Sequence, residues 1–257
     1  MRDQKNHPGR EPDLRPTHDA CDPLAFDELE DVRGELEELE KWMEEADLLR
    51  MQYEEYLASG KKEIPFDANG FCIKDRQLWF YGGPGGVVRV PEGVTEIMPF
   101  AFETCEGLTG VELPETLREI GEAAFGAQAA LEDITIPRGV EIIRSGAFAE
   151  CAALRRLSLP ETLREIGFRA FSGCRGLEAL SLPDSLAVIE AFAFESCSGL
   201  TEVRIPDHVR EIDVSAFADC DHLRRVSLPA HVRLDAFDFC AAEIVYRSPA
   251  PEKGDAT

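Results

Sequence analysis

Residues 160–183 read PETLREIGFRAFSGCRGLEALSLP, and this stretch decides the fold because its pattern returns along the chain at a constant interval. The stretch begins and ends with proline, and prolines recur every 23 residues at Pro91, Pro114, Pro137, Pro160, Pro183, Pro206 and Pro229. An Ala-Phe pair keeps the same interval, with Phe102, Phe125, Phe148, Phe171, Phe194 and Phe217. A leucine does so too, at Leu108, Leu131, Leu154, Leu177, Leu200 and Leu223. Because nearly every constant position is apolar, the 23-residue unit repeats a piece of core.

Each unit contains two short segments that favour extended structure. Residues 154–159 (LRRLSL) show the pattern of a brief buried strand, with Arg156 and Ser158 on the side away from the leucines. Residues 140–148 (VEIIRSGAF) predict a second brief strand that leads into a tight helical turn. Proline has no N–H to donate to a sheet, so each repeated proline is expected at a strand end or corner.

The repeat predicts a leucine-rich repeat solenoid over residues 88–247, in which short parallel strands stack every 23 residues and brief helical turns join them. Stacked coils place equivalent residues about 4.8 Å apart, so each column of Phe, Leu or Ile becomes a ladder inside the solenoid. Fully buried, the large apolar side chains of one coil would contribute about 12 kcal/mol, less than the cost of ordering the coil at about 1–2 kcal/mol per residue. Burial against neighbouring coils is therefore obligatory.

The constant residues resemble the BspA-like leucine-rich repeat, whose pattern is I-G-x-x-A-F-x-x-C-x-x-L-x-x-I-x-[IL]-P. The segment LPETLREIG occurs twice, at 113–121 and at 159–167, while one copy has Gln128 in place of the Cys. Residues 71–90 (FCIKDRQLWFYGGPGGVVRV) are similar to the leading hairpin of that family, which predicts a β-hairpin cap over 65–90. The resemblance implies a ligand-binding or adhesive scaffold without chemistry of its own, of a kind often exposed at cell surfaces.

Outside the repeats, residues 1–22 and 248–257 are predicted to be disordered tails, because they are rich in Pro, Gly and charge and nearly devoid of apolar residues. Residues 23–60 predict one long, acidic, amphipathic α-helix. Its apolar seam advances in alternating steps of three and four, as in a coiled coil, through Leu29, Val32, Leu36, Leu39 and Met43. We expect the seam to be buried against a partner or another copy in preference to the first coil.

The charge balance narrows the choice of partners. Among 257 residues, 27 Lys and Arg stand against 50 Asp and Glu, which gives a net charge of −23. Such a surface repels phosphate backbones and anionic lipid headgroups, so no nucleic acid and no membrane partner is expected. The sequence shows neither an apolar secretory signal near its start nor a wall anchor, which favours a cytoplasmic location.

Residue types that often carry chemistry fall on ordinary repeat positions. Four cysteines occupy one column and form no CxxC pair, so they predict packing and no metal site. They are Cys151, Cys174, Cys197 and Cys220. His208 and His231 lie one repeat apart without a third ligand, and are interpreted as two corner residues. The glycine-rich residues 82–86 lack the lysine of a phosphate loop and predict a hairpin turn. No cofactor and no catalytic residue are expected.

The variable strand positions form the surface of the predicted solenoid. Two neighbouring columns are expected to make one exposed face, with small residues at its centre and separated charges around them. The candidate partner-binding residues are Asp133, Arg156, Ser158, Ser181, Glu202, Arg204 and Arg225. Asp133 with Arg156, and Glu202 with Arg225, are column neighbours of opposite charge that can pair. The central serines would let a partner backbone approach closely.

These patterns favour a non-enzymatic interaction protein that binds a protein partner through this face, with the 23–60 helix as a second contact element. The alternative is a self-assembling or adhesin-like protein whose copies pair through that helix, giving a homo-oligomer. A hydrolase or metalloenzyme is the least favoured class, because no set of acid, base and nucleophile departs from the repeat.

Overall fold

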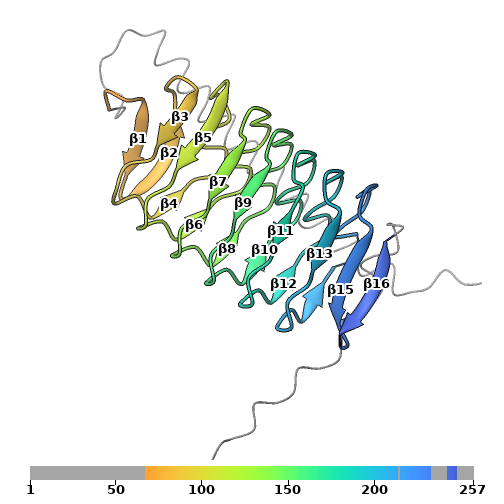
Figure 1. Ribbon diagram of the computed structural model, residues 1–257. Coiled ribbons are helices and arrows are strands. Elements are labelled where there is room, and N and C mark those ends of the chain that lie inside the picture. The colour runs from red at the N-terminus through yellow and green to blue at the C-terminus, as the bar shows by residue number, and fades with distance from the viewer. Residues whose placement is uncertain (1–66, 214, 233–241, 248–257) are drawn as a thin grey trace, which may run out of the picture. The chain divides into compact units, whose positions relative to one another are not determined.

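The computed structural model of the protein describes residues 67–213, 215–232 and 242–247 (Figure 1). The predictions of two tails and of a helix with its seam concern residues outside this part of the chain. Within it, the chain forms strands joined by turns and no helix. No helix of the described ranges is therefore long and apolar enough to cross a membrane.

The strands form one eight-stranded and two four-stranded sheets. The first sheet contains, in spatial order, β1 (Phe71–Lys74), β2 (Gln77–Tyr81), β4 (Glu96–Ile97), β6 (Glu119–Ile120), β8 (Ile142–Ile143), β10 (Glu165–Ile166), β12 (Val188–Ile189) and β14 (Glu211–Ile212). The second sheet contains β3 (Gly86–Arg89), β5 (Leu108–Glu112), β7 (Asp133–Thr135) and β9 (Arg156–Ser158). The third contains β11 (Leu180–Ser181), β13 (Glu202–Arg204), β15 (Arg225–Pro229) and β16 (Glu243–Arg247).

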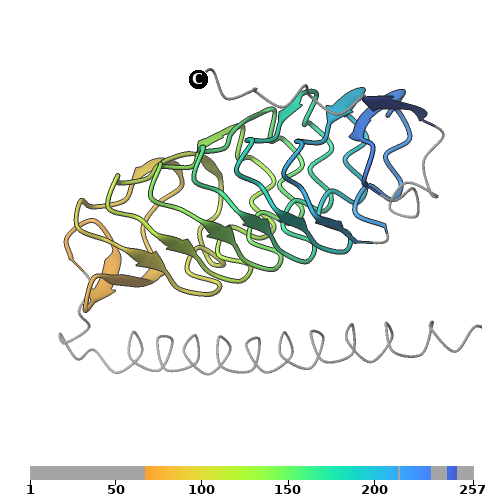
Figure 2. The same cartoon turned by 90° about the horizontal axis from the view of Figure 1, so that it is seen from below.

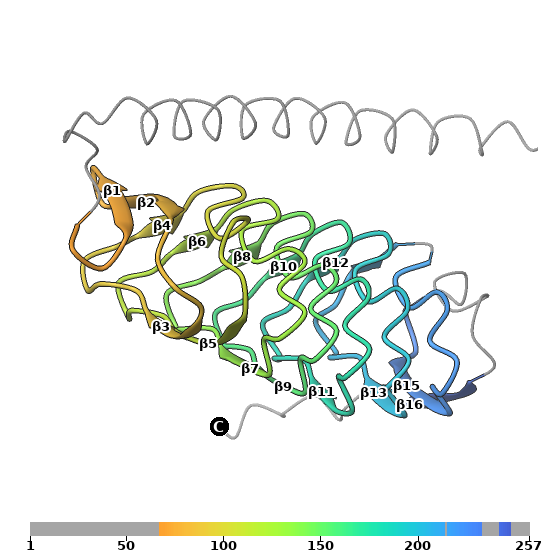
Figure 3. The same ribbon diagram turned by 90° about the horizontal axis from the view of Figure 1, so that it is seen from above.

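Successive coils each place one strand in the first sheet and one in the second or third. The second and third sheets follow one another along one side (Figure 1), and the first sheet runs along the other side (Figures 2 and 3). The register follows the repeat: Glu119 pairs with Ile142, and Asp133 pairs with Arg156, both in parallel strands. The predicted leucine-rich repeat solenoid of stacked parallel strands is therefore confirmed.

The repeated phenylalanines form a continuous stack inside the coils. Phe102, Phe125, Phe148, Phe171, Phe194 and Phe217 are at most 1% exposed. Their neighbouring ring centroids lie between 4.6 and 5.4 Å apart. Tyr81 of β2 continues the stack, 5.2 Å from Phe102, and Phe71 of β1 follows it at 4.8 Å. The hairpin therefore covers the N-terminal end of the aromatic core with aromatic rings of its own.

The corner that carries each Ala-Phe pair is built from hydrogen-bonded turns. The Ala149 N–H donates to the carbonyl of Gly146 at 2.8 Å within the coil. Between coils, the Phe148 N–H donates to the carbonyl of Ala170, also at 2.8 Å. The brief helical turns of the prediction are thus single turns. Other N–H groups of these turns donate to carbonyls of the next coil, which joins the coils at this corner as well as through the sheets.

The glycine-rich residues 82–86 do not form the hairpin turn that the sequence predicted. The turn between β1 and β2 is made by Asp75 and Arg76, which both have positive φ, at 51° and 69°, as a type I′ hairpin turn requires. The glycines instead carry the chain from the first sheet to the second. A Cβ on Gly85 would lie 2.1 Å from the carbonyl oxygen of Glu106, so only glycine lets the two backbones approach this closely.

Candidate functional site

The cysteine column is part of the core. Cys151, Cys174 and Cys197 are fully buried, and each Sγ lies 3.2 Å from a phenylalanine carbonyl oxygen of the preceding coil. Burial raises the pKa of the Cys151 thiol to about 12 and that of the Cys174 and Cys197 thiols well above 9. Such thiols stay protonated at neutral pH and donate to the carbonyls, which is a structural role.

The exception to the cysteine pattern keeps its hydrogen bond. Gln128 occupies the same column, is 5% exposed, and donates from Nε2 to the carbonyl of Phe102 at 2.8 Å. This bond joins the same two repeat positions as the bond from Cys151 to Phe125. From Gln128 onward the column therefore holds a buried donor of suitable reach, and a thiol and an amide both supply one.

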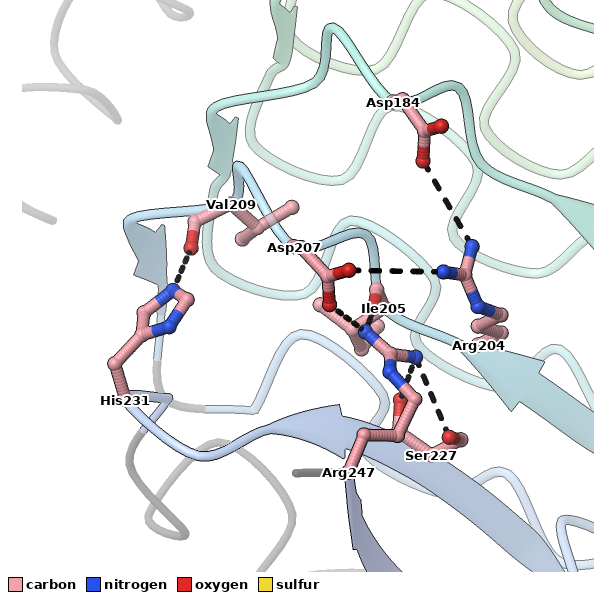
Figure 4. A network of polar contacts seen from close by, with 8 residues as sticks. All are labelled: Asp184, Arg204, Ile205, Asp207, Val209, Ser227, His231 and Arg247. Carbon is pink, nitrogen blue, oxygen red and sulfur yellow. Dashed lines mark hydrogen bonds and ion pairs between the residues drawn. The ribbon is translucent and has the colours of Figure 1, made fainter. Parts of the chain in front are cut away.

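His231, two residues after the repeated Pro229, is a corner residue as predicted. Its Nε2 lies 2.8 Å from the carbonyl oxygen of Val209, so His231 bonds the preceding coil (Figure 4). Thr162 and Ser185 stand at the same repeat position and donate to Val140 and Leu163 in the same way. Among the residues that the structure describes, no group of three or more His, Cys, Asp or Glu is arranged to hold a metal ion.

The strand face consists of the exposed side chains of the second and third sheets. All seven candidate residues lie on these strands. Asp133, Arg156 and Ser158 belong to β7 and β9 in the second sheet, and Ser181, Glu202, Arg204 and Arg225 belong to β11, β13 and β15 in the third. Six of the seven are exposed to solvent, and Asp133 is half-buried.

The expected charge pairs of the strand face form only in part. Arg156 bonds the carboxylate of Asp133, as the column predicts. Glu202 lies beside Arg225 in the register of β13 and β15. The guanidinium of Arg225, however, pairs with Glu243 of β16, with 3.8 Å between Nη2 and Oε2. The predicted pairing of Glu202 with Arg225 is therefore replaced by one with the following strand.

At the C-terminal end of the strand face, two arginines and two acids form a network (Figure 4). Arg247 donates to the carbonyl of Ile205, at 2.5 Å, and to the carboxylate of Asp207. Its hydrogen bond lowers the pKa of the Asp207 carboxyl below its usual range. Arg204 lies between two carboxylates, 3.7 Å from Asp184 and 3.9 Å from Asp207. The side chain of Arg247 thus ties β16, across β15, to the residues that directly follow β13.

Sequence reasoning missed the acids of this network and Arg247. Asp184 and Asp207 each follow a repeated proline, one repeat apart, so their common position was available as a signal. Arg247 lies beyond the last repeated proline, and β16 pairs with β15 at an offset of 18 residues instead of 23. A search for residues at the repeat interval cannot find it.

The centre of the strand face lies where the row of strands is interrupted. The second sheet ends at β9 and the third begins at β11, and these two neighbouring strands belong to separate sheets. Ser158 and Ser181, on opposite sides of this break, are both exposed, and so is Ala179 beside them. The two serines therefore do not share one ladder, and together with Ala179 they form a short uncharged region of small side chains.

Stacked parallel strands at a 23-residue register, with a ladder of buried Leu and Phe, define a leucine-rich repeat solenoid. The model of the "BspA type Leucine rich repeat region (6 copies)" matches residues 79–154 and 124–243. The chain therefore belongs to the BspA-type leucine-rich repeat family, whose repeats build protein-interaction or adhesion scaffolds.

Solved structures with a similar chain path include bacterial leucine-rich repeat proteins. A leucine-rich repeat protein of T. pallidum is 27% identical, with 70% of this chain and 84% of that chain covered and a TM-score of 0.49. A leucine rich cell surface protein of Faecalibacterium prausnitzii is 23% identical, with 63% of this chain covered and a TM-score of 0.42. This chain spans only 60% of that protein. No curated protein matches the sequence.

Proposed function

We propose that this chain is a non-enzymatic scaffold that binds a protein partner across the strand face, centred on Ser158 and Ser181. The observation that carries the proposal is the exposed, small and uncharged region at the break between β9 and β11. Small side chains there leave room for the backbone of a partner to lie close to the solenoid. Interface centres are depleted in charge and their rims are polar, which is the distribution of this face.

The charged residues around this centre support the same reading. Arg156 is 78% exposed, yet its guanidinium is already bonded to Asp133. Arg204 lies within reach of two acids. Side chains that are already oriented lose less conformational entropy on binding than free ones. Paired charges around an uncharged centre also favour selection among partners and the rate of association, more than raw affinity.

The test is a binding series on the full chain with the partner recovered by affinity capture and identified by mass spectrometry. Ser181→Trp places an indole on the centre of the face and should weaken binding at least about tenfold, equivalent to about 1.4 kcal/mol. The matched control is Glu211→Trp, which places the same side chain at an exposed position of β14 in the first sheet. The control should bind as the wild type does, and both variants should melt as it does.

A second arm addresses the rim. Reversing Arg156 and Arg225 to Glu should lower the association rate and its dependence on salt, with a small change in melting temperature. The proposal is wrong if Ser158→Trp, Ser181→Trp and both reversals leave binding of the captured partner unchanged. The binding element would then be sought in residues 23–60.

A further inference from the structure

The two sides of the solenoid end in four outer strands, and one of them is built differently from the others. β1 pairs with β2 in a register that shifts between Cys72 and Ile73, where Trp79 of β2 is the extra residue of a bulge. β3 has an irregular register between Gly86 and Val87, and β14 has only two residues. Bulges and short strands are the usual means of protecting a sheet edge from pairing with another chain. β16 lacks both features, because its five residues pair with β15 in an unbroken register.

The apolar side chains of β16 are incompletely covered. Ile244 and Tyr246 pair with Val226 and Leu228, which are fully buried. Tyr246 itself is 46% exposed and Ile244 is half-buried. Val245 on the outer face is 37% exposed. In the described part of the chain, β16 has a neighbouring strand on one side only, so these columns of the core end at an open edge.

The backbone of β16 directs a defined set of polar groups to that edge. The N–H of Glu243 donates to the carbonyl of Arg224, at 2.7 Å, so the backbone groups of residue 243 point toward β15. Backbone groups of alternate residues in a strand point the same way. The N–H and C=O groups of Ile244 and Tyr246 therefore point to the free edge, where they can pair with an added strand.

We propose that this edge binds the same edge of a second copy, in a symmetric antiparallel dimer centred on Val245. In this register Ile244 lies opposite Tyr246 of the second copy, and the two exchange both backbone hydrogen bonds. The symmetry axis repeats that exchange, so four hydrogen bonds use all the outward backbone groups of Ile244 and Tyr246 in both copies. The third sheet becomes an eight-stranded sheet across the dimer.

The side chains of this segment are complementary to themselves in that register. The sequence EIVYR sets Glu243 opposite Arg247 of the second copy, so no residues of like charge oppose each other, while within each copy Arg247 stays bonded to Asp207 and Glu243 stays paired with Arg225. Ile244 and Tyr246 meet on the core side, which continues the apolar columns, and the two Val245 side chains meet on the outer face. Self-complementarity about an axis is the condition for a two-fold interface, and it is the reason to choose a second copy over an unrelated strand.

The test is sedimentation of the full chain over a concentration series, with Tyr246→Pro and Tyr246→Phe as the paired variants. Proline removes the N–H that points to the free edge and leaves those that point toward β15, so the dimer dissociation constant should rise at least about tenfold. Phenylalanine keeps the backbone donor and should dimerise as the wild type does. Because each copy carries a charge of −23, moderate salt should tighten the dimer by screening repulsion.

A cross-linking arm covers the case in which Tyr246→Pro lowers the melting temperature. Two Val245→Cys side chains would face each other across the axis with Cβ atoms about 5 Å apart, and mild oxidation should link them. Ser227→Cys is the matched control, because it lies one strand further from the axis in the same column. The proposal is overturned by a chain that stays monomeric at every concentration, by Tyr246→Pro dimers as tight as wild type, or by equal cross-linking of the two cysteine variants.

Discussion

Phe148→Ala is the sharpest test of the aromatic ladder. The ring of Phe148 is 0% exposed and lies between those of Phe125 and Phe171, with centroid distances of 5.2 and 5.3 Å. The interplanar angles of 8° and 3° show that it stacks on both neighbours. Removing it takes a large apolar group from the core and leaves a gap between two rigid coils. Neighbouring coils are also bonded through their sheets and corners, so the gap cannot close by a local shift.

The expected loss is about 3–5 kcal/mol of unfolding free energy, the usual range for a buried Phe→Ala substitution. Small domains have about 5–15 kcal/mol in total, so the variant should lose a large fraction of its stability. For a domain of this size, about 2–4 °C in melting temperature per kcal/mol predicts a fall of roughly 10 °C. In a solenoid each coil contacts only its neighbours, so a weakened central coil should also broaden or divide the unfolding transition.

Urea unfolding followed by circular dichroism measures this loss. Val87→Ala is the control, because Val87 is 70% exposed on the strand face and its truncation should cost less than about 0.5 kcal/mol. A loss below about 1 kcal/mol for Phe148→Ala would refute the reasoning, since the ring would then contribute no more than a surface side chain.

Two further predictions concern the donor column next to the ladder. Gln128→Leu should cost about 0.5–1.5 kcal/mol in urea unfolding, because the buried carbonyl of Phe102 loses one of its two donors and keeps only the N–H of Cys105, whereas Gln128→Cys should recover part of that loss. Equal losses in the two variants would show that packing volume and not the hydrogen bond matters at this position. Since burial raises the pKa of the Cys151 thiol from about 9 to about 12, the folded state retains this proton at pH values where the unfolded state has released it. The stability that depends on the protonated Cys151 thiol is therefore complete below pH 9 and is lost as the pH rises toward 12. Between these pH values the wild type should lose more unfolding free energy than Cys151→Ala. Parallel pH profiles of the two proteins would contradict the raised pKa of Cys151.

The sequence by itself determined the coils, their register and most of the core. A coil cannot bury its apolar residues alone, so equivalent residues of neighbouring coils must contact each other. The constant offset of 23 residues therefore predicts which residues are in contact. The stacking of Phe148 on its neighbours and the pairing of Asp133 with Arg156 both follow from that offset. The solvent exposure of Ser158 and Ser181 follows from the strand alternation in the same way.

Only the tertiary structure decided what departs from the offset. The hairpin turn at Asp75 and Arg76 occurs once, so no repetition could separate it from the more conspicuous glycines nearby. Arg225 lies between Glu202 on the preceding strand and Glu243 on the following strand, and its guanidinium pairs with Glu243. The spacing of residues in the sequence does not determine which of two neighbouring acids a flexible, exposed side chain contacts. Arg247 bonds Asp207, which lies 40 residues earlier in the chain. It can do so because β16 pairs with β15 at an offset of 18 residues instead of 23, which places the Arg247 guanidinium over the preceding coils.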